Sequence, residues 1–451
     1  MTPNRKYDLI VFIILFSLVF SMKLDAASLP YSWDALGPDI PSVYINMARN
    51  GFNLLSGDVI FLHPPLPYLL GAASYLIFGE QPISIGILML IASSVTLFFT
   101  YKIGELVYSK QAGALAALSL FLMPLFFSHS ALSLAFNLVV PLHVMAVYFT
   151  LKHDLWKFTA AASAIALSRE MDMITVLVLA IFWLRQKNKR HLALAIPFAV
   201  SFSWMVYVKL VYGSMIHPSF FRLFAPISIA LLDNFVARST EFFVNQGRFA
   251  VIGVILVSQY FQAKKPAIES QFEYISLVLI LSALAIFSFI GSFLPRYLLP
   301  FYPLIFLLAF GGVSKYKSSF YPGALFIFLS IIFISGWHGT RDLPAGWLLE
   351  TNMEYADMVK THQEAAAYIQ DNFPNALVAT CWPMTTELSD NMFGYVDQKV
   401  QVTDNLQDPN VDIIYYSRQS NCYDHKISPS QFRLLKEFSS KGKLTRVYQR
   451  I

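Results

Sequence analysis

Two aspartates and a histidine carry the most evident chemistry of the sequence, and all three lie between residues 31 and 66. The stretch reads YSWDALGPDIPSVYINMARNG and, further along, HPPL. Asp34 and Asp39 are candidate general bases, because a carboxylate at a low-dielectric boundary has a raised pKa that suits proton transfer. His63 opens the HPPL motif, where its imidazole can donate to a phosphate or ligate a metal.

Each of these side chains also has an ordinary structural explanation. An aspartate at a helix start caps the free N–H groups of the first turn, and the pattern after Pro41 predicts an amphipathic helix there. The prolines of HPPL fix φ at a helix entry, where His63 would act as a cap. We favour catalysis for Asp39 and capping for Asp34, and both roles stay open for His63.

Two arginines supply the matching positive charge. Arg169 lies in Ser-Arg-Glu between two short apolar runs, and Arg296 lies in Pro-Arg-Tyr at the start of another. A guanidinium fork matches phosphate oxygens, and charges this close to a bilayer are costly and often functional. The alternative is snorkelling to lipid headgroups, which carries equal weight for Arg169 and less for Arg296.

The composition indicates what must position these groups. The chain has 451 residues, of which 56% are hydrophobic and 14% charged, and its mean hydropathy is +0.53. A soluble domain is about 25% charged, and runs of about 20 apolar residues match the bilayer core. The sequence therefore predicts a polytopic α-helical membrane protein. The net charge of +5 gives no indication of nucleic acid binding.

Apolar runs predict about eleven transmembrane helices in a membrane domain over residues 1–339. We expect the first run, from Leu9, to stay uncleaved with its N-terminus in the cytoplasm. The others are expected near 83–101, 112–128, 132–151, 157–170, 172–185, 192–211, 248–262, 274–293, 297–313 and 319–337. Lys and Arg gather in alternate loops, as the positive-inside rule requires. This pattern places the first loop, residues 25–82, and the C-terminus on the outer side.

The segment 340–451 is more polar and predicts a small α/β domain on the outer side. A helix is expected over 352–371, and short buried strands over 376–380 and 411–416. The two cysteines of the chain, Cys381 and Cys422, both fall in this segment. In an oxidising compartment they can form a disulfide. Two separate buried thiols are an equally weighted alternative.

The order of these motifs resembles the GT-C fold glycosyltransferases that use lipid-linked sugars. The resemblance is carried by Asp39 and Tyr44, then HPPL, SRE and RYLLPFYP, and it covers about residues 1–340. AAAYIQDNFPNALVATCWP also resembles the outer domain of such proteins. The nearest group is the bacterial relatives of protein O-mannosyltransferases and of the lipid A aminoarabinose transferase. Outer-side juxtamembrane helices belong to this fold type.

The sequence departs from that family at two acidic positions. The family usually shows Asp-Glu in the first loop, whereas Asp39 is followed by Ile40. An ungapped alignment on Tyr44 places Ile40 in the aspartate column, so Asp34 also stays a candidate. Many relatives have a second acid where Asn137 lies here. A mechanism with two carboxylates or a divalent metal is therefore left open.

The resemblance implies inverting sugar transfer from a polyprenyl phosphate, such as undecaprenyl phosphate, to an acceptor hydroxyl or amine. The acceptor would be a glycan, lipid or protein outside the bacterial inner membrane, and the product would belong to the cell envelope. Asp39 or Asp34 would act as the base. The substrate and lipid phosphate would be bound by Arg296, Arg169, His63, Tyr44 and Tyr297. The alternatives are a secondary transporter and a non-catalytic subunit that binds the lipid carrier.

Overall fold

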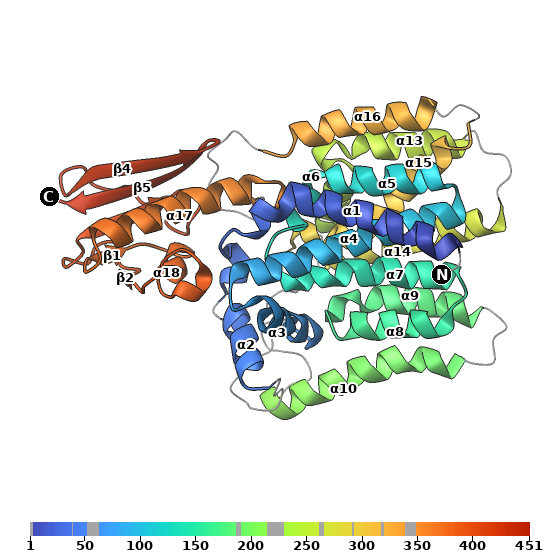
Figure 1. Cartoon of the computed structure of the whole chain (residues 1–451), viewed down its shortest axis with the longest axis horizontal. Helices are drawn as coiled ribbons and strands as arrows, with labels where there is room; N and C mark the ends of the chain where they lie inside the picture. Colours follow the sequence, from blue (N-terminus) through green and yellow to red (C-terminus); the bar gives the residue numbers. More distant parts are fainter. Residues whose placement is uncertain are drawn as a thin grey trace.

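A bundle of roughly parallel helices forms most of the molecule (Figure 1). The computed structural model describes residues 3–37, 39–51, 63–185, 191–213, 230–260, 266–290, 293–316, 320–338 and 349–451; the side chains of residues 3–5, 39–40, 135–136, 212, 230, 259–260 and 349 lie outside that description. The bundle helices are α1 (Pro3–Ala27), α4 (Pro82–Val107), α5 (Lys110–Leu122), α7 (Val139–Leu151), α8 (Leu155–Ala166), α9 (Met173–Leu184), α10 (Ala195–Tyr212), α13 (Phe249–Tyr260), α14 (Ala267–Ser288), α15 (Tyr302–Val313) and α16 (Phe320–Ser335).

Each predicted span overlaps one of these helices, and the predicted residues 261–262, 291–292 and 319 lie outside the described residues. Among the described residues, five helical stretches are long and apolar enough to cross a membrane: Lys6–Ala27, Pro82–Val107, His191–Val211, Ala267–Ser288 and Pro295–Val313. Shorter apolar helices accompany them, among them α5, α7 and α16. The protein is thus a helical membrane-type protein, while the number of eleven spans stays a prediction.

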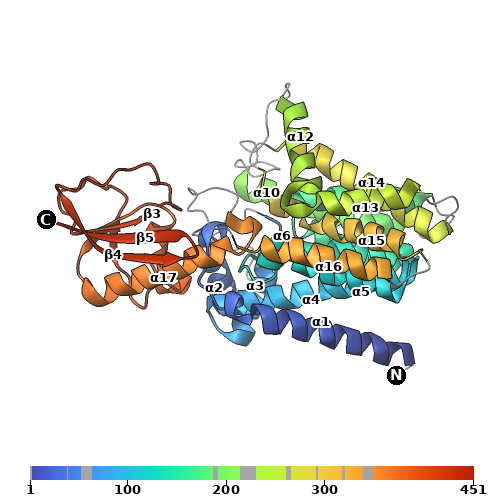
Figure 2. The same cartoon turned by 90° about the horizontal axis from the view of Figure 1, so that it is seen from above.

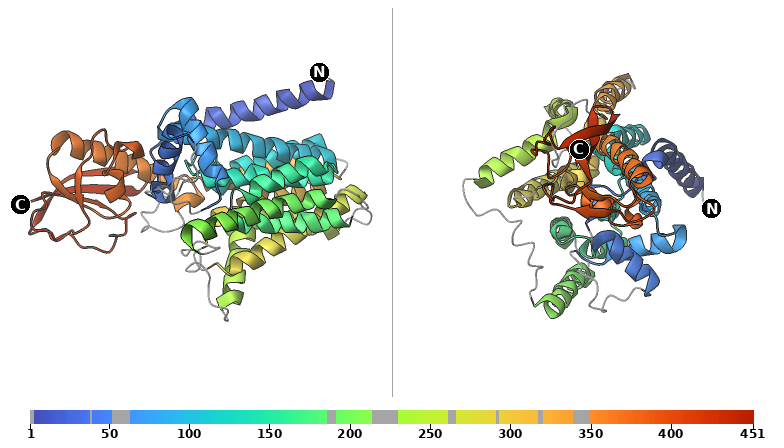
Figure 3. Two further views of the ribbon diagram at one scale, coloured as in Figure 1. Left: turned by 90° about the horizontal axis from the view of Figure 1, so that it is seen from below. Right: turned by 90° about the vertical axis from the view of Figure 1, so that its left-hand side faces the viewer.

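Burial separates central helices from peripheral ones. Of the 18 most apolar consecutive residues in the Pro295–Val313 stretch, 83% are buried. The corresponding share for α1 is 17%. Accordingly, α1 lies along one edge of the bundle and packs against α4 (Figures 2 and 3). Side chains that project from the beginning of the Pro295–Val313 stretch therefore lie near the centre of the molecule.

Short elements gather at the end of the bundle opposite the N-terminus (Figure 1). They include two helices of the first loop, α2 (Asp39–Arg49) and α3 (Leu66–Phe78), which pack against each other. The other short elements are η1 (Trp33–Leu36), α6 (Pro124–His129), η2 (Ala135–Leu138), η3 (Glu170–Asp172), η4 (His191–Leu194), α12 (Ala230–Phe243), η5 (Asn245–Gly247), η6 (Pro295–Phe301) and η7 (Leu349–Thr351). Of these, η4 lies at the other end of the bundle, before α10.

The C-terminal segment forms a five-stranded sheet at that same end, with α17 (Glu354–Asn372) packed on it (Figure 1). The strand order is β2-β1-β3-β5-β4, parallel among β2, β1 and β3 and antiparallel for β5 and β4. The strands are β1 (Leu377–Ala379), β2 (Gln401–Thr403), β3 (Ile413–Ser417), β4 (Phe432–Ser440) and β5 (Lys443–Arg450), with α18 (Met384–Glu387) and η8 (Asn391–Phe393) between β1 and β2.

The predicted helix and both predicted strands of this segment are present as α17, β1 and β3. The hairpin of β4 and β5 was not predicted. Cys381 and Cys422 are joined in a disulfide, with their Cα atoms 5.8 Å apart. The bond ties the end of β1 to the loop after β3.

Candidate functional site

Arg296 lies at the centre of the candidate site, in the 3₁₀ segment η6 that precedes α15. Pro295 opens this segment and Pro300 lies inside it. Proline lacks the N–H that an α-helix needs in its interior, so these residues favour the tighter turn over a continuous α-helix. The side chain of Arg296 is only 9% exposed. The sequence thus places a guanidinium inside the protein, just before the start of the central helix α15.

The Arg296 guanidinium holds two carboxylates from distant parts of the chain. Its Nη2 donates to Asp34 in η1, and its Nη1 donates to Glu350 in η7. Glu350 is nearly buried, with 10% of its side chain exposed, whereas the side chain of Asp34 is 33% exposed. Burial raises the pKa of Glu350, and the opposing effect of Arg296 does not cancel this shift. Of the two carboxylates that Arg296 binds, Asp34 of the first loop is thus the more exposed.

A histidine and an asparagine extend this cluster behind Glu350. Nε2 of His129 lies 4.0 Å from Oε2 of Glu350, and Nδ2 of Asn137 donates to Nδ1 of His129 over 2.8 Å. Burial lowers the pKa of His129 well below its ordinary value, and the charge of Arg296 adds to the shift. Burial thus favours the neutral form of His129, whose Nε2 atom faces Glu350.

Tyr297 connects Arg296 to the second predicted arginine. The guanidinium carbon of Arg169 lies 5.0 Å from the centre of the Tyr297 ring, and that of Arg296 lies 5.9 Å from it. Such distances allow cation–π attraction. Arg169 also donates to the buried carboxylate of Asp172, by Nε and, over 3.0 Å, by Nη2. Two arginines that are 127 positions apart are thus held on one aromatic ring.

The HPPL motif meets the loop that carries Arg169. The backbone N–H of Leu66 donates to the carbonyl of Leu167 over 2.8 Å. Nδ1 of His63 lies 3.4 Å from Oε2 of Glu170. The prolines before α3 direct the chain into this contact, because they prevent earlier helix formation. The structure therefore brings His63 to the residue next to Arg169.

An apolar groove begins at Glu170. Its volume is about 440 Å³, and it runs between α9, α10 and α14. Its lining includes Met173, Leu177, Phe202 and Met205. A charged site and a groove of aliphatic and aromatic side chains thus adjoin each other. Such a combination suits an amphiphile with a charged head and an apolar tail.

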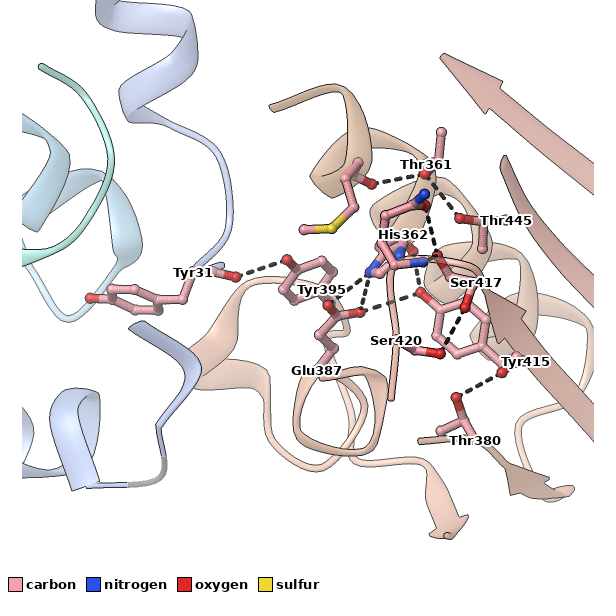
Figure 4. A network of polar contacts seen from close by, with 12 residues as sticks. Tyr31, Thr361, His362, Thr380, Glu387, Tyr395, Tyr415, Ser417, Ser420 and Thr445 are labelled. Carbon is pink, nitrogen blue, oxygen red and sulfur yellow. Dashed lines mark hydrogen bonds and ion pairs between the residues drawn. The ribbon is translucent and has the colours of Figure 1, made fainter. Parts of the chain in front are cut away.

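The C-terminal unit, which consists of α17 and the five-stranded sheet over residues 354–451, contacts the segment that carries Asp34. The N–H of Tyr31 donates to the carbonyl of Phe393 over 3.2 Å, and the hydroxyl of Tyr395 donates to the carbonyl of Tyr31 over 2.8 Å (Figure 4). Trp33 has a φ of 47°, which is uncommon for a residue other than glycine, and its ring lies 4.6 Å from that of Trp382. The C-terminal unit thus fixes the backbone on which Asp34 is carried.

Not every predicted residue has contacts at this site. Tyr44 is fully buried in α2, where its ring contacts those of Tyr68 and Tyr75 in α3. These contacts explain how α2 packs on α3, and a phosphate-binding role for Tyr44 stays a prediction. Asp39 begins α2, and its side chain lies outside the described residues.

Three groups of the site were not predicted: Glu350, His129 and Asp172. Glu350 and His129 are single polar residues without a surrounding motif. Asp172 lies three residues after Arg169, a spacing that suits a local ion pair and was the one available signal. Among the residues that the structure describes, three or more His, Cys, Asp or Glu side chains do not come together as a metal-binding group.

Comparisons with known proteins agree with this architecture. A family model described as "Predicted membrane protein (DUF2079)" matches residues 46–442. None of the curated proteins matches the chain. The structure of ArnT from Cupriavidus metallidurans bound to undecaprenyl phosphate is similar, with a TM-score of 0.59, 13% identity and 97% of each chain covered. Its apo structure gives a TM-score of 0.53, 12% identity, and coverage of 96% of this chain and 97% of that one. The chain thus has the GT-C fold that its motifs indicated.

Proposed function

This chain belongs to the DUF2079 family of predicted membrane proteins, and we propose that it is a glycosyltransferase. It moves a sugar, with inversion, from a polyprenyl-phosphate carrier to an acceptor on the outer face of the bacterial inner membrane. The ArnT fold supports this proposal, because a solved structure of that fold holds undecaprenyl phosphate. Basic residues in alternate loops, together with eleven predicted spans, predict a cytoplasmic N-terminus and a C-terminal unit outside.

One observation carries the proposal: Arg169, which shares the Tyr297 ring with Arg296, directly precedes Glu170, where the apolar groove begins. A polyprenyl phosphate combines a charged head with a long apolar tail, and both halves have a matching surface here. Guanidinium groups bind phosphate oxygens bidentately. The groove opens between membrane helices, where a tail can enter from the lipid.

The ion pairs of Arg296 indicate how the phosphate gains access. The guanidinium already holds Asp34 and Glu350, so an incoming phosphate must take the place of one carboxylate. Asp34 is the more exposed of the two and is the one that exchanges. Glu350 then keeps Arg296 in place while Asp34 is released. Exchange thus couples carrier binding to the appearance of a free carboxylate.

The released Asp34 accepts the proton of the acceptor hydroxyl or amine. The acceptor then attacks the sugar carbon from the face opposite the phosphate, and the bond from that carbon to the phosphate oxygen breaks. Arg296 and Arg169 stabilise the charge that develops on the leaving phosphate. The first-loop alternative is Asp39, which the sequence favoured.

Binding of the carrier tests the proposal. The full chain, purified in lipid nanodiscs, is titrated with undecaprenyl phosphate and with undecaprenol, which has the same tail and no phosphate. We expect tighter binding of the phosphate, and we expect Arg296→Ala to abolish the difference. Equal affinity for the two lipids in the natural protein would contradict the proposal. A secondary transporter or a non-catalytic subunit can also bind the carrier, so turnover must be measured as well.

A further inference from the structure

A large polar cleft lies between the first loop and the C-terminal unit, apart from the Arg296 cluster. Its volume is about 920 Å³. One wall is formed by α2 and the start of α4, and the other by α17 and residues 390–397. Figure 1 shows α2 and the C-terminal unit side by side at this end of the bundle. The volume lies within the range of pockets that hold small ligands, about 300–1,000 Å³.

The charge of the cleft is negative. Four carboxylates line it against a single guanidinium, that of Arg49, which gives a formal net charge of −3. Arg49 is itself engaged, because its Nε and Nη2 donate to Glu80 over 2.9 and 2.5 Å. The hydrogen bond from Arg49 lowers the pKa of Glu80. The cleft therefore repels phosphate groups and does not suit the lipid carrier.

Carboxamides supply most of the other polar side chains of the lining, beside the hydroxyl of Tyr395. They belong to Gln81, Gln363, Gln370 and Asn391. An amide both donates and accepts hydrogen bonds, and a carboxylate accepts them. A sugar hydroxyl also does both, so neighbouring hydroxyls of a sugar ring can pair with amides and carboxylates together. This lining suits a polyhydroxylated ligand better than an apolar one.

The wall at residues 390–397 is bonded to Tyr31, in the segment that carries Asp34. The Tyr395 hydroxyl donates to the carbonyl of Tyr31 (Figure 4), and the Phe393 carbonyl accepts from the N–H of Tyr31. Gly394 has a φ of +87°, and a Cβ there would lie 3.2 to 3.4 Å from Pro82 and Pro30, so the two walls meet closely at this point. Asp34 follows Tyr31 by three residues, a span of at most about 11 Å.

We propose that this cleft binds the acceptor, and that the acceptor is a glycan that is neutral or carries amino groups. The inference rests on the proposed transferase function. A glycan held in the cleft extends along the Tyr31 segment toward Asp34, where the carrier sugar is transferred to it. The negative lining excludes acidic glycans, and its amides and carboxylates bind sugar hydroxyls and amines.

Binding of three hexasaccharides to the full chain in nanodiscs tests this inference. The probes are chitohexaose with protonated amines, neutral N-acetylchitohexaose and acidic hexagalacturonate. We expect chitohexaose to bind best, N-acetylchitohexaose next and hexagalacturonate least. Asp371→Arg should weaken chitohexaose binding about tenfold, because it reverses a charge in the lining. Glu364→Arg is the matched control, an exposed acid of α17 outside the cleft, and should change little.

Undecaprenyl phosphate is titrated into the same preparations. If it binds while none of the hexasaccharides does, the inference is overturned and the proposed function stands. If chitohexaose binds and responds to Asp371→Arg while the carrier does not bind, the glycan site is supported and the transferase function fails. Equal effects of Asp371→Arg and Glu364→Arg would overturn the inference. So would binding of a lysine-rich peptide in place of the glycans, with sensitivity to Asp371→Arg.

Discussion

Arg296 donates a hydrogen bond to the carboxylate of Asp34, although 262 positions of sequence separate them. The pair joins the first loop to the segment that opens a central helix. Its two members differ in exposure, since the Arg296 side chain is 9% exposed and that of Asp34 is 33% exposed. The arginine is therefore fixed and the aspartate is the replaceable partner. The proposed mechanism depends on this asymmetry.

Replacement of Arg296 by alanine should abolish the preference for undecaprenyl phosphate over undecaprenol, and it should abolish turnover. Arg296→Ala leaves the buried Glu350 without its partner, which typically costs about 3–5 kcal/mol. Arg296→Lys should restore only part of the activity, because an ammonium group cannot form the bidentate fork. The measurement is undecaprenyl phosphate affinity together with release of undecaprenyl phosphate from lipid-linked sugars.

A second buried arginine provides the control for stability. Arg248 is 1% exposed, is paired with Glu241 and lies over the Tyr302 ring. Arg248→Lys should lower the unfolding temperature as Arg296→Lys does, yet leave carrier affinity unchanged. If both variants weaken carrier binding equally, Arg296 acts through stability alone.

Tyr297 should matter through its ring and not through its hydroxyl. Tyr297→Phe keeps the surface over which Arg169 and Arg296 lie, so it should behave like the natural protein. Tyr297→Leu removes a cation–π attraction of about 0.5–2 kcal/mol. It should therefore raise the KM for the carrier several-fold, with a smaller effect on kcat. Equal losses in the two variants would point to the hydroxyl instead.

Glu350 should give folding a particular pH dependence. Burial raises its pKa in the folded protein above the ordinary 4.5, so the folded state binds this proton more tightly than the unfolded state. Its contribution to stability is complete below pH 4.5 and is lost as pH rises through the folded-state pKa. Relative to Glu350→Gln, the natural protein should lose thermal stability over that interval.

Tryptophan fluorescence during heating, at a series of pH values, measures this difference. Glu437→Gln serves as the control, because Glu437 is an exposed partner of Arg446. Unfolding midpoints that run parallel for the natural protein and Glu350→Gln would show that Glu350 is not responsible.

The disulfide of Cys381 and Cys422 should stabilise the C-terminal unit. It closes a sequence separation of 41, worth roughly 4 kcal/mol on the chain-entropy estimate. We expect mass analysis without reductant to find no alkylated thiol in protein isolated from membranes, and we expect reduction to lower the unfolding temperature. Two alkylated cysteines before reduction would contradict the bond.

The sequence indicated those parts of the fold and of the candidate site that have local signals. Arg169 and Arg296 were recognised because a charge beside an apolar run is costly, and α17, β1 and β3 because their apolar residues recur with a helix or strand period. The β4 and β5 hairpin was missed, because several of its outward positions are charged, among them Arg433, Lys436 and Glu437. Such a pattern has a weak hydrophobic signal.

The pairing of these residues could not be predicted. Glu350 is one acid in an unremarkable stretch, and its importance comes from Arg296, which binds it across 54 positions. His129 likewise gains its role from Asn137 and Glu350. Contacts of this kind depend on how the helices pack, and no local pattern in the sequence indicates that packing.

The proposed role of Asp34 as the general base is tested by the turnover of Asp34→Asn. Purified protein in nanodiscs is given a panel of undecaprenyl-phosphate-linked hexoses and pentoses, and released undecaprenyl phosphate is measured by mass spectrometry. We expect kcat to fall about 10²–10⁴-fold, the usual contribution of a general base. Carrier affinity should be kept or increased, because Arg296 loses a competing carboxylate. Asp39→Asn should remain active; a loss there alone would move the base to Asp39. Near-normal turnover in a variant that carries both Asp34→Asn and Asp39→Asn would contradict the mechanism.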